Sequence, residues 1–236
     1  MGKEQQDRRL TDQGKAGHCL ARFAAFLTAE PARDDTMLTI YYARTPNGMK
    51  PLLFATEHGP EADYRYVDLA KKEQFDPDFL KIAPNNKIPA MTDGDVALFE
   101  SGVILEYLAD KHLDFRNDPN RYTILTWLYW QVGGLGPMGG QNHFFREFAP
   151  EPIPFAIERY TAECKRLYGV LDGHLAQNEF VGGAGYHIAD MAIYPWIWYH
   201  DLHHVPLSDY PHVKRWFDSL TNRPSVKEAY ARFFTP

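Results

Sequence analysis

The feature that most constrains the fold is a proline, Pro89, near the start of the first of two short apolar segments within residues 85–99. Residues 88–91 and 96–99 predict two strands, and the Asp93-Gly94 pair between them is a strong signal for a tight hairpin turn. Pro89 has no N–H to donate and restricts the residue before it. We therefore expect Ile88 to be extended, with its own N–H and C=O unpaired at a strand edge. The sequence predicts a sheet edge that is able to pair with a peptide-like ligand.

A helix is expected directly after this hairpin. Glu100, Ser101 and Gly102 open a run with apolar residues at helical spacing, through residues 103–108. A helix N-terminus presents free backbone N–H groups, which hold anions such as a ligand carboxylate. Two interpretations stay open from spacing alone: a site for a short peptide with a free acid group, or a hairpin and a helix cap with purely structural roles.

The two motifs together, Asn-Lys-Ile-Pro-Ala at 86–90 and Phe-Glu-Ser-Gly at 99–102, resemble the glutathione-binding half of the glutathione S-transferase superfamily. With the turn Thr-Pro-Asn-Gly at 45–48, the chain is similar to the bacterial Nu class of glutathione-dependent disulfide-bond oxidoreductases. The resemblance covers about residues 38–229. It implies an enzyme that uses glutathione as co-substrate and forms a homodimer.

Composition excludes several other classes. The net charge is −6 with no basic cluster, which argues against a nucleic-acid partner. No apolar run approaches the roughly 18 residues that span a bilayer, so no membrane partner is expected. The two cysteines, Cys19 and Cys164, form neither a disulfide framework nor a metal pattern, and the histidines lack ligand spacing. We expect a cytoplasmic protein without a metal.

The predicted fold class is α+β, with four parts. Residues 1–37 form an N-terminal extension, whose apolar patch at 19–27 is interrupted by Arg22; this argues against a secretory signal and favours a surface helix or disorder. Residues 38–113 predict a thioredoxin-like βαβαββα domain, with helices at 49–58, 75–82 and 100–111. Residues 114–120 are a linker, and residues 121–236 predict an all-α helical-bundle domain.

Four features of the helical part bear on its structure or function. The glycines between 133 and 140 suggest a phosphate-binding loop, but no strand precedes them, so close helix approach or a bend is the better interpretation. Cys164 lies on the apolar stripe of a helix at 153–178 and is expected to be a buried thiol. His187 and Asp190 resemble the superfamily's capping box, with His187 in place of the usual Ser or Thr. Pro195 predicts a kink in the helix that follows.

The candidate catalytic residues are Asn47 and Thr45. Chemistry on glutathione needs a thiolate, so the thiol pKa must fall from about 8.5 toward neutrality. The turn offers the Thr45 hydroxyl, the Asn47 amide and the backbone N–H groups of residues 47–49 at a helix N-terminus. An ordinary turn and cap is the alternative interpretation. Tyr41 or Tyr42 is a further candidate for the activating hydroxyl, unless both are core aromatics.

The resemblance implies a glutathione site made of eight residues: Asn47, Gln74, Lys87, Ile88, Pro89, Glu100, Ser101 and Arg159. Lys87 would bind the glycyl carboxylate, or be a solvated loop charge. Gln74 would otherwise be a surface amide. Arg159 would bind a second glutathione, across the dimer interface, or pair with Glu158 or Glu163 on its helix. Seven residues are candidates to line an acceptor pocket: Trp127, Trp130, Gln141, Asn142, His143, Phe144 and Phe145.

The related beta class has a cysteine in the first turn, where this chain has Asn47. We therefore predict that both thiols come from glutathione and that the substrate is a small disulfide. Two alternatives remain: a transferase or peroxidase acting on hydrophobic electrophiles or hydroperoxides, and a non-enzymatic binding module with the same fold.

Overall fold

Four short strands form one mixed sheet in the N-terminal half of the computed structural model, which describes residues 37–183 and 185–234. The strands are β1 (Thr39–Tyr42), β2 (Asp63–Tyr66), β3 (Ala90–Asp93) and β4 (Val96–Phe99), in the order β2-β1-β3-β4. β1 pairs parallel to β2 and antiparallel to β3, and β3 pairs antiparallel to β4 with Asp93 opposite Val96. The hairpin prediction is confirmed. The expectations for residues 1–36, including those for Cys19, lie outside the described residues.

The helices of this half are α2 (Pro46–His58), η1 (Glu73–Phe75), α3 (Pro77–Ile82) and α4 (Ser101–His112), which gives the expected βαβαββα order. α2 begins at Pro46, earlier than the expected residue 49. Proline at the first helical position is favourable because its missing N–H would have no partner there, and Thr45 supplies the N-cap. Asn47 therefore lies inside the first turn of α2 instead of before the helix.

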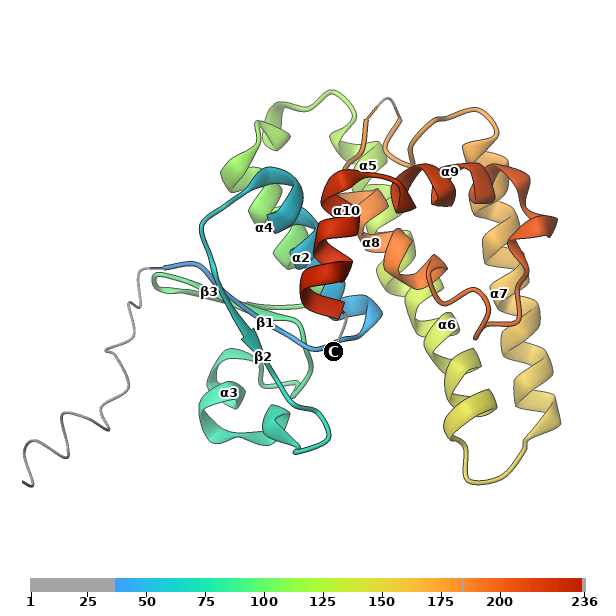
Figure 1. Cartoon of the computed structure of the whole chain (residues 1–236), viewed down its shortest axis with the longest axis horizontal. Coiled ribbons are helices and arrows are strands. Elements are labelled where there is room, and N and C mark those ends of the chain that lie inside the picture. Colours follow the sequence, from blue (N-terminus) through green and yellow to red (C-terminus); the bar gives the residue numbers. More distant parts are fainter. Residues whose placement is uncertain (1–36, 184, 235–236) are drawn as a thin grey trace, which may run out of the picture. The chain divides into compact units, whose positions relative to one another are not determined.

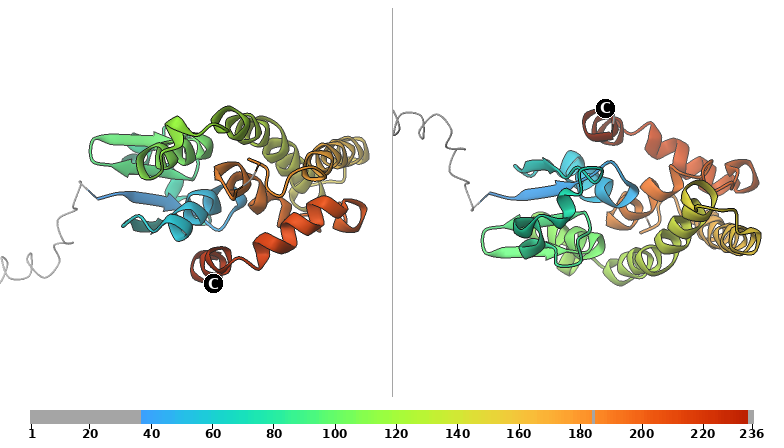
Figure 2. Two further views of the ribbon diagram at one scale, coloured as in Figure 1. Left: turned by 90° about the horizontal axis from the view of Figure 1, so that it is seen from above. Right: turned by 90° about the horizontal axis from the view of Figure 1, so that it is seen from below.

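The C-terminal half is helical, so the predicted fold class is confirmed. Figure 1 and Figure 2 show its long helices beside the sheet-containing half. The elements are α5 (Arg121–Trp130), η3 (Gln131–Leu135), α6 (Gly136–His143), η4 (Phe144–Phe148), α7 (Pro154–Leu175), α8 (Ile188–Ile197), η5 (Leu207–Asp209), α9 (Pro211–Thr221), α10 (Pro224–Ala229) and η6 (Tyr230–Phe234). None of the helices among the described residues combines the length and the apolar character that crossing a membrane requires.

The helix α8 is buried along its whole length and contacts α2, α4, α5 and α6, so it joins the two halves through one core. Its start is held by Asp190, which accepts hydrogen bonds from the backbone N–H groups of Val181 (2.8 Å) and His187 (3.0 Å) and from Trp216 Nε1 (2.8 Å). Burial nevertheless raises the pKa of Asp190 to about 6. The imidazole of His187 does not repeat the hydroxyl's role, because it pairs with Asp118 at 3.1 Å.

Three further features concern the helices around the site. The π-helix η3 lies between α5 and α6, and such segments often occur at functional sites. A Cβ on Gly139 would come within 3.1 Å of both Trp196 and His203, so close helix approach explains this glycine. α10 returns to the end of α2, where Glu57 accepts hydrogen bonds from Arg223 (Nε, 2.8 Å) and from Ser225. The sequence interpretation missed this last helix.

Candidate functional site

The N-terminus of α2 is capped by its own residues. Thr45 Oγ1 accepts a hydrogen bond from the N–H of Gly48 at 3.1 Å, and the N–H of Met49 donates to the Thr45 carbonyl at 3.1 Å. The expectation that the N–H groups of Gly48 and Met49 are free was therefore wrong, because both belong to the cap and the first helical turn. The Thr45 hydroxyl keeps its own hydrogen to donate. Only glycine fits at residue 48, since a Cβ there would lie 2.1 Å from the Ala43 carbonyl oxygen.

The orientation of the Asn47 amide is determined by Trp196 of α8. The indole Nε1 donates to Asn47 Oδ1 at 3.0 Å. Because an indole N–H is a donor only, the amide oxygen must face Trp196 and the NH₂ group must face the other way. The structure gives this NH₂ group no partner within the described residues. Asn47 thus presents a free donor at the start of a helix.

Two adjoining cavities meet at this point. The larger, of about 560 Å³, is lined by the polar residues Asn47, Lys50, Lys87, Glu100, Ser101, Gln131 and Gln141 and by Val132, Gly136, Pro137, Gly140, Phe144 and Trp196. The smaller, of about 270 Å³, is lined by Asn47, Asn85, Lys87, Ile88, Pro89, Phe99, Glu100 and Ser101. The structure therefore brings together six of the eight predicted glutathione-site residues: Asn47, Lys87, Ile88, Pro89, Glu100 and Ser101.

The backbone around the smaller cavity has unusual conformations. The Ile88–Pro89 peptide bond is cis. Glu100, the N-cap of α4, has φ = 75°, a region that side-chain-bearing residues rarely adopt, and its side chain makes no capping hydrogen bond. Strained backbone of this kind clusters at functional sites. Glu100 therefore does not cap α4 through its side chain, and its role in binding glutathione stays a prediction.

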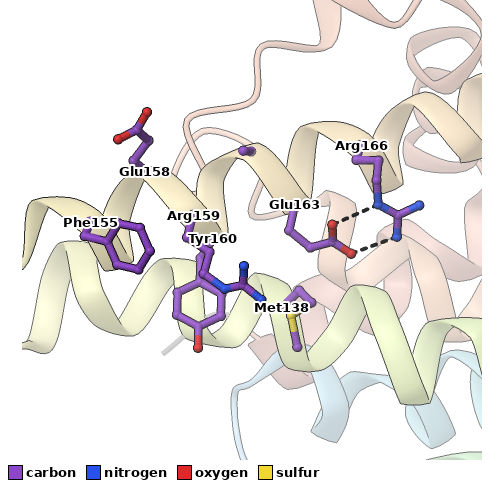
Figure 3. Close-up of a pocket in the computed structure, with 8 residues that line it drawn as sticks. Met138, Phe155, Glu158, Arg159, Tyr160, Glu163 and Arg166 are labelled. Carbon is purple, nitrogen blue, oxygen red and sulfur yellow. Dashed lines mark hydrogen bonds and ion pairs between the residues drawn. The ribbon is translucent and has the colours of Figure 1, made fainter.

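Two predicted residues lie elsewhere. Gln74, in η1, lines neither cavity, and its Oε1 is buried without a partner. Arg159, on α7, lines a separate cavity of about 670 Å³ next to Met138, Phe155 and Tyr160 (Figure 3). Glu163 pairs with Arg166 at 2.7 Å, and the alternative of an ion pair between Arg159 and Glu163 does not form. A role for Arg159 in a second glutathione site stays a prediction.

The aromatic candidates divide in the same way. Of the seven residues proposed to line an acceptor pocket, Gln141 and Phe144 line the larger cavity. Asn142 is buried and donates to the His203 carbonyl at 2.7 Å instead. Tyr41 packs on Phe79 and Tyr42 on Phe233, so both are partly buried against the core, and neither lines the two cavities.

Sequence reasoning missed three residues of the site: Lys50, Gln131 and Trp196. Lys50 is fully buried, and its Nζ donates to Ser101 Oγ (3.0 Å) and to Gln131 Oε1 (2.5 Å). Burial lowers the pKa of Lys50 to about 7, and the Glu100 carboxylate opposes that shift. No local signal marked Lys50, because lysine is almost never fully buried unless it is paired, and its partners lie 51 and 81 positions away.

Residues 36–110 match the family model "Glutathione S-transferase, N-terminal domain", and residues 154–219 match "Glutathione S-transferase, C-terminal domain". Two relatives from Escherichia coli are the disulfide-bond oxidoreductases YfcG, 48% identical over 82% of this chain and 94% of its own length, and YghU, 38% identical over 80% and 73%.

Solved structures agree. A glutathione transferase family member from Pseudomonas fluorescens with two glutathione molecules bound has a TM-score of 0.78 at 38% identity, covering 84% of this chain and 94% of that chain. A glutathione transferase from Pseudomonas putida with one glutathione disulfide bound per subunit has a TM-score of 0.76 at 36% identity, covering 84% and 93%. The chain belongs to the glutathione S-transferase family, which includes the two oxidoreductases from Escherichia coli, and it is an enzyme of that family.

Proposed function

We propose that the protein is a glutathione-dependent disulfide-bond oxidoreductase that uses two glutathione thiols and no protein cysteine. One observation carries this proposal: the position at the start of α2, on the wall of both cavities, is occupied by Asn47. The described cysteine, Cys164, is buried on α7, and burial raises the pKa of its thiol to about 11. A thiol with so high a pKa is a poor nucleophile at neutral pH.

The electrons then come from glutathione alone. A first glutathione thiolate attacks one sulfur of the substrate disulfide, the S–S bond breaks, and one substrate thiol leaves after taking up a proton. The second glutathione thiolate attacks the glutathione sulfur of the mixed disulfide. The mixed disulfide bond breaks, glutathione disulfide is released, and the second substrate sulfur leaves as a thiolate that takes up a proton. The Pseudomonas fluorescens structure holds two glutathione molecules, and the Pseudomonas putida structure holds glutathione disulfide. Both observations support this order of steps.

Each side chain has a distinct role in this proposal. The Asn47 NH₂ group donates to a glutathione sulfur, assisted by the Thr45 hydroxyl, and the N-terminus of α2 favours the thiolate. Ile88 pairs through its backbone with the cysteinyl part, next to Pro89. Lys87 binds the glycyl carboxylate, and Glu100 and Ser101 bind the γ-glutamyl end. Gln74 is assigned to the same site on family resemblance.

Arg159 completes the proposed site from a partner subunit. It lies outside the cavities that contain Asn47 in this chain, so a contribution to the second glutathione requires a homodimer. We propose that the protein is a cytoplasmic homodimer of this kind.

A second candidate function is glutathione transfer to a hydrophobic electrophile, or reduction of a hydroperoxide. It is favoured by the apolar wall of the larger cavity, which includes Val132, Pro137, Phe144 and Trp196. Steady-state assays of the purified protein separate these functions, with glutathione and a small disulfide, a hydroperoxide or an aryl halide as acceptor. A kcat/KM that is highest for the disulfide supports our proposal. A higher value for either other acceptor, with little disulfide turnover, overturns it.

A further inference from the structure

Lys50 occupies a place where an unpaired charge would be costly. Its side chain is buried, yet its residue lines the larger cavity together with Asn47 and Ser101. It is held from two sides: by Ser101 at the start of α4 and by Gln131 at the start of η3. A buried ammonium group that is paired only with neutral oxygens is expensive, so a function is a better explanation than stability.

The donors and acceptors of Lys50, Ser101 and Gln131 determine the direction of each hydrogen bond between them. An ammonium group has three donors and no acceptor, so Ser101 Oγ must accept from Lys50. The hydroxyl hydrogen of Ser101 is then left to point elsewhere, and no acceptor for it lies within residues 37–183 and 185–234. Gln131 must likewise turn its oxygen to Lys50. Its Nε2 is buried without a partner.

We propose that Lys50 is a positioning residue of the glutathione site: by donating to Ser101, with Gln131 as its anchor, it turns the Ser101 hydroxyl into a donor for the ligand's γ-glutamyl carboxylate. This inference rests on the proposed function, because it takes glutathione as the ligand. Ser101 lines both cavities, so its hydroxyl is placed where a carboxylate can reach it.

Because the charge of Lys50 changes with pH, the direction of its hydrogen bond with Ser101 also depends on pH. Burial lowers its pKa to about 7, so the group is an ammonium below neutral pH and becomes an amine as pH rises. A neutral amine has a lone pair and can accept the Ser101 hydrogen, which removes the donor from the ligand. A bound carboxylate favours the ammonium form and raises the pKa of Lys50. Ligand binding and protonation of Lys50 therefore support each other.

Few other groups are able to produce the same effect. The titratable residues that line the larger cavity with Lys50 are Lys87 and Glu100, whereas α8 contributes Trp196 and η3 contributes Gln131. Glu100 is the charged group whose field acts on Lys50. Replacing Lys50 therefore shows which part of the pH dependence of binding comes from Lys50 and which part comes from Lys87 and Glu100.

The test is calorimetry of S-methylglutathione binding between pH 6 and pH 8.5, since this ligand has no thiol to titrate. The full-length wild type is compared with Lys50→Met, Gln131→Met and the control Lys81→Met, whose lysine is exposed on α3 and paired with Asp78. We expect wild-type affinity to fall by about tenfold across this range, the factor that one pKa unit represents. Lys50→Met should bind about tenfold more weakly at pH 6 and lose most of the pH dependence. Lys81→Met should follow the wild type.

Gln131→Met tests the inference without removing the lysine, and does so even if Lys50→Met fails to fold. Losing its anchor should lower the pKa of Lys50 further, so the fall in affinity should move to lower pH. A Lys50→Met variant that melts normally and keeps the wild-type affinity and pH profile overturns the inference alone. Weaker binding with an unchanged profile also overturns it, because it indicates a structural role. A wild type that binds no S-methylglutathione overturns the proposed function as well.

Discussion

The indole nitrogen of Trp196 donates to the amide oxygen of Asn47 at 3.0 Å, a hydrogen bond between residues 149 positions apart in the sequence. Trp196 is itself held by the helical core, because its ring stacks on His203 with centroids 6.2 Å apart and an interplanar angle of 16°. His203 is buried and makes a hydrogen bond with the Tyr168 hydroxyl at 3.2 Å. The direction of the amide at the candidate site is thus determined by the other half of the chain.

Trp196→Phe should lower disulfide turnover by roughly fivefold, because the lost hydrogen bond is worth about 1 kcal/mol and the amide becomes free to rotate. Phenylalanine keeps one aromatic ring but loses the rest of the buried indole, so a lower melting temperature is expected and is measured as well. The measurement is kcat and KM for a small disulfide. Trp198→Phe is the matched control at the end of the same helix, because the Trp198 indole has no hydrogen bond in the described structure. An equal loss in both variants would show that only packing was disturbed.

Asn47→Ala should raise the pH at which bound glutathione ionises and reduce turnover by about tenfold or more. A donor that favours the thiolate lowers the thiol pKa, and each unit is worth about 1.4 kcal/mol. Because the thiolate is the reactive form, the pH–rate profile of the variant should shift to higher pH. Binding should change less, since the carboxylates of glutathione are held elsewhere. Normal melting with an unshifted profile and full turnover would mean that Asn47 only shapes the helix start, and Thr45 would then be the residue to test.

Local signals were enough to predict the hairpin at Asp93-Gly94, the order of strands and helices, and the residues around Ile88 and Ser101. These features depend on neighbouring residues in the chain, whose turn and periodicity patterns are visible directly. The early start of α2 was also visible in principle, because Thr45 before Pro46 is a helix-start signal. Six of the eight predicted glutathione-site residues lie together because they belong to three compact motifs, at 45–48, 86–90 and 99–102, which carry the family resemblance.

Contacts between distant segments were not predictable. Gln131 reaches Lys50 across 81 positions, and no local pattern in either segment indicates that they meet. The same holds for Trp196 and Asn47. A lysine in a helix is normally read as exposed, so its burial became visible only when α4 and η3 were placed against α2.

Replacing Glu100 and Ser101 together by alanine should weaken glutathione binding by one to a few kcal/mol, on the order expected for charge-assisted hydrogen bonds. Both residues line the two cavities. Calorimetry measures the affinity. Because Ser101 is buried and accepts a hydrogen bond from Lys50, thermal melting is the control for a loss of stability. Unchanged affinity would show that Glu100 and Ser101 do not bind the γ-glutamyl end of glutathione.

A double Cys19→Ser and Cys164→Ser variant should keep most of its glutathione-dependent disulfide reductase activity. Cys164 is buried with a raised pKa, and Asn47 occupies the activating position. Initial rates with saturating glutathione provide the comparison, with circular dichroism as the check on folding. Activity that vanishes in a folded variant would place a protein thiol in the mechanism.

Gly136→Ala should disturb the anchor of Lys50 from the far side of the cavity. A Cβ at this position would lie 2.6 Å from Gln131 Nε2 and 3.4 Å from Trp196 Cε2. Gln131 is fully buried, so its amide has little room to move without loosening its hydrogen bond to Lys50. An ammonium group that loses an acceptor is less stabilised, so the pKa of Lys50 should fall below about 7 and more of it should be neutral at neutral pH. Calorimetry with S-methylglutathione should then show weaker binding at pH 7 and a smaller difference from wild type at pH 6.

Gly173→Ala is the matched control, because a Cβ there meets nothing within 4 Å and α7 gains up to about 1 kcal/mol of helix propensity. Wild-type affinity and pH dependence in Gly136→Ala would show that Gln131 yields without cost and does not anchor Lys50.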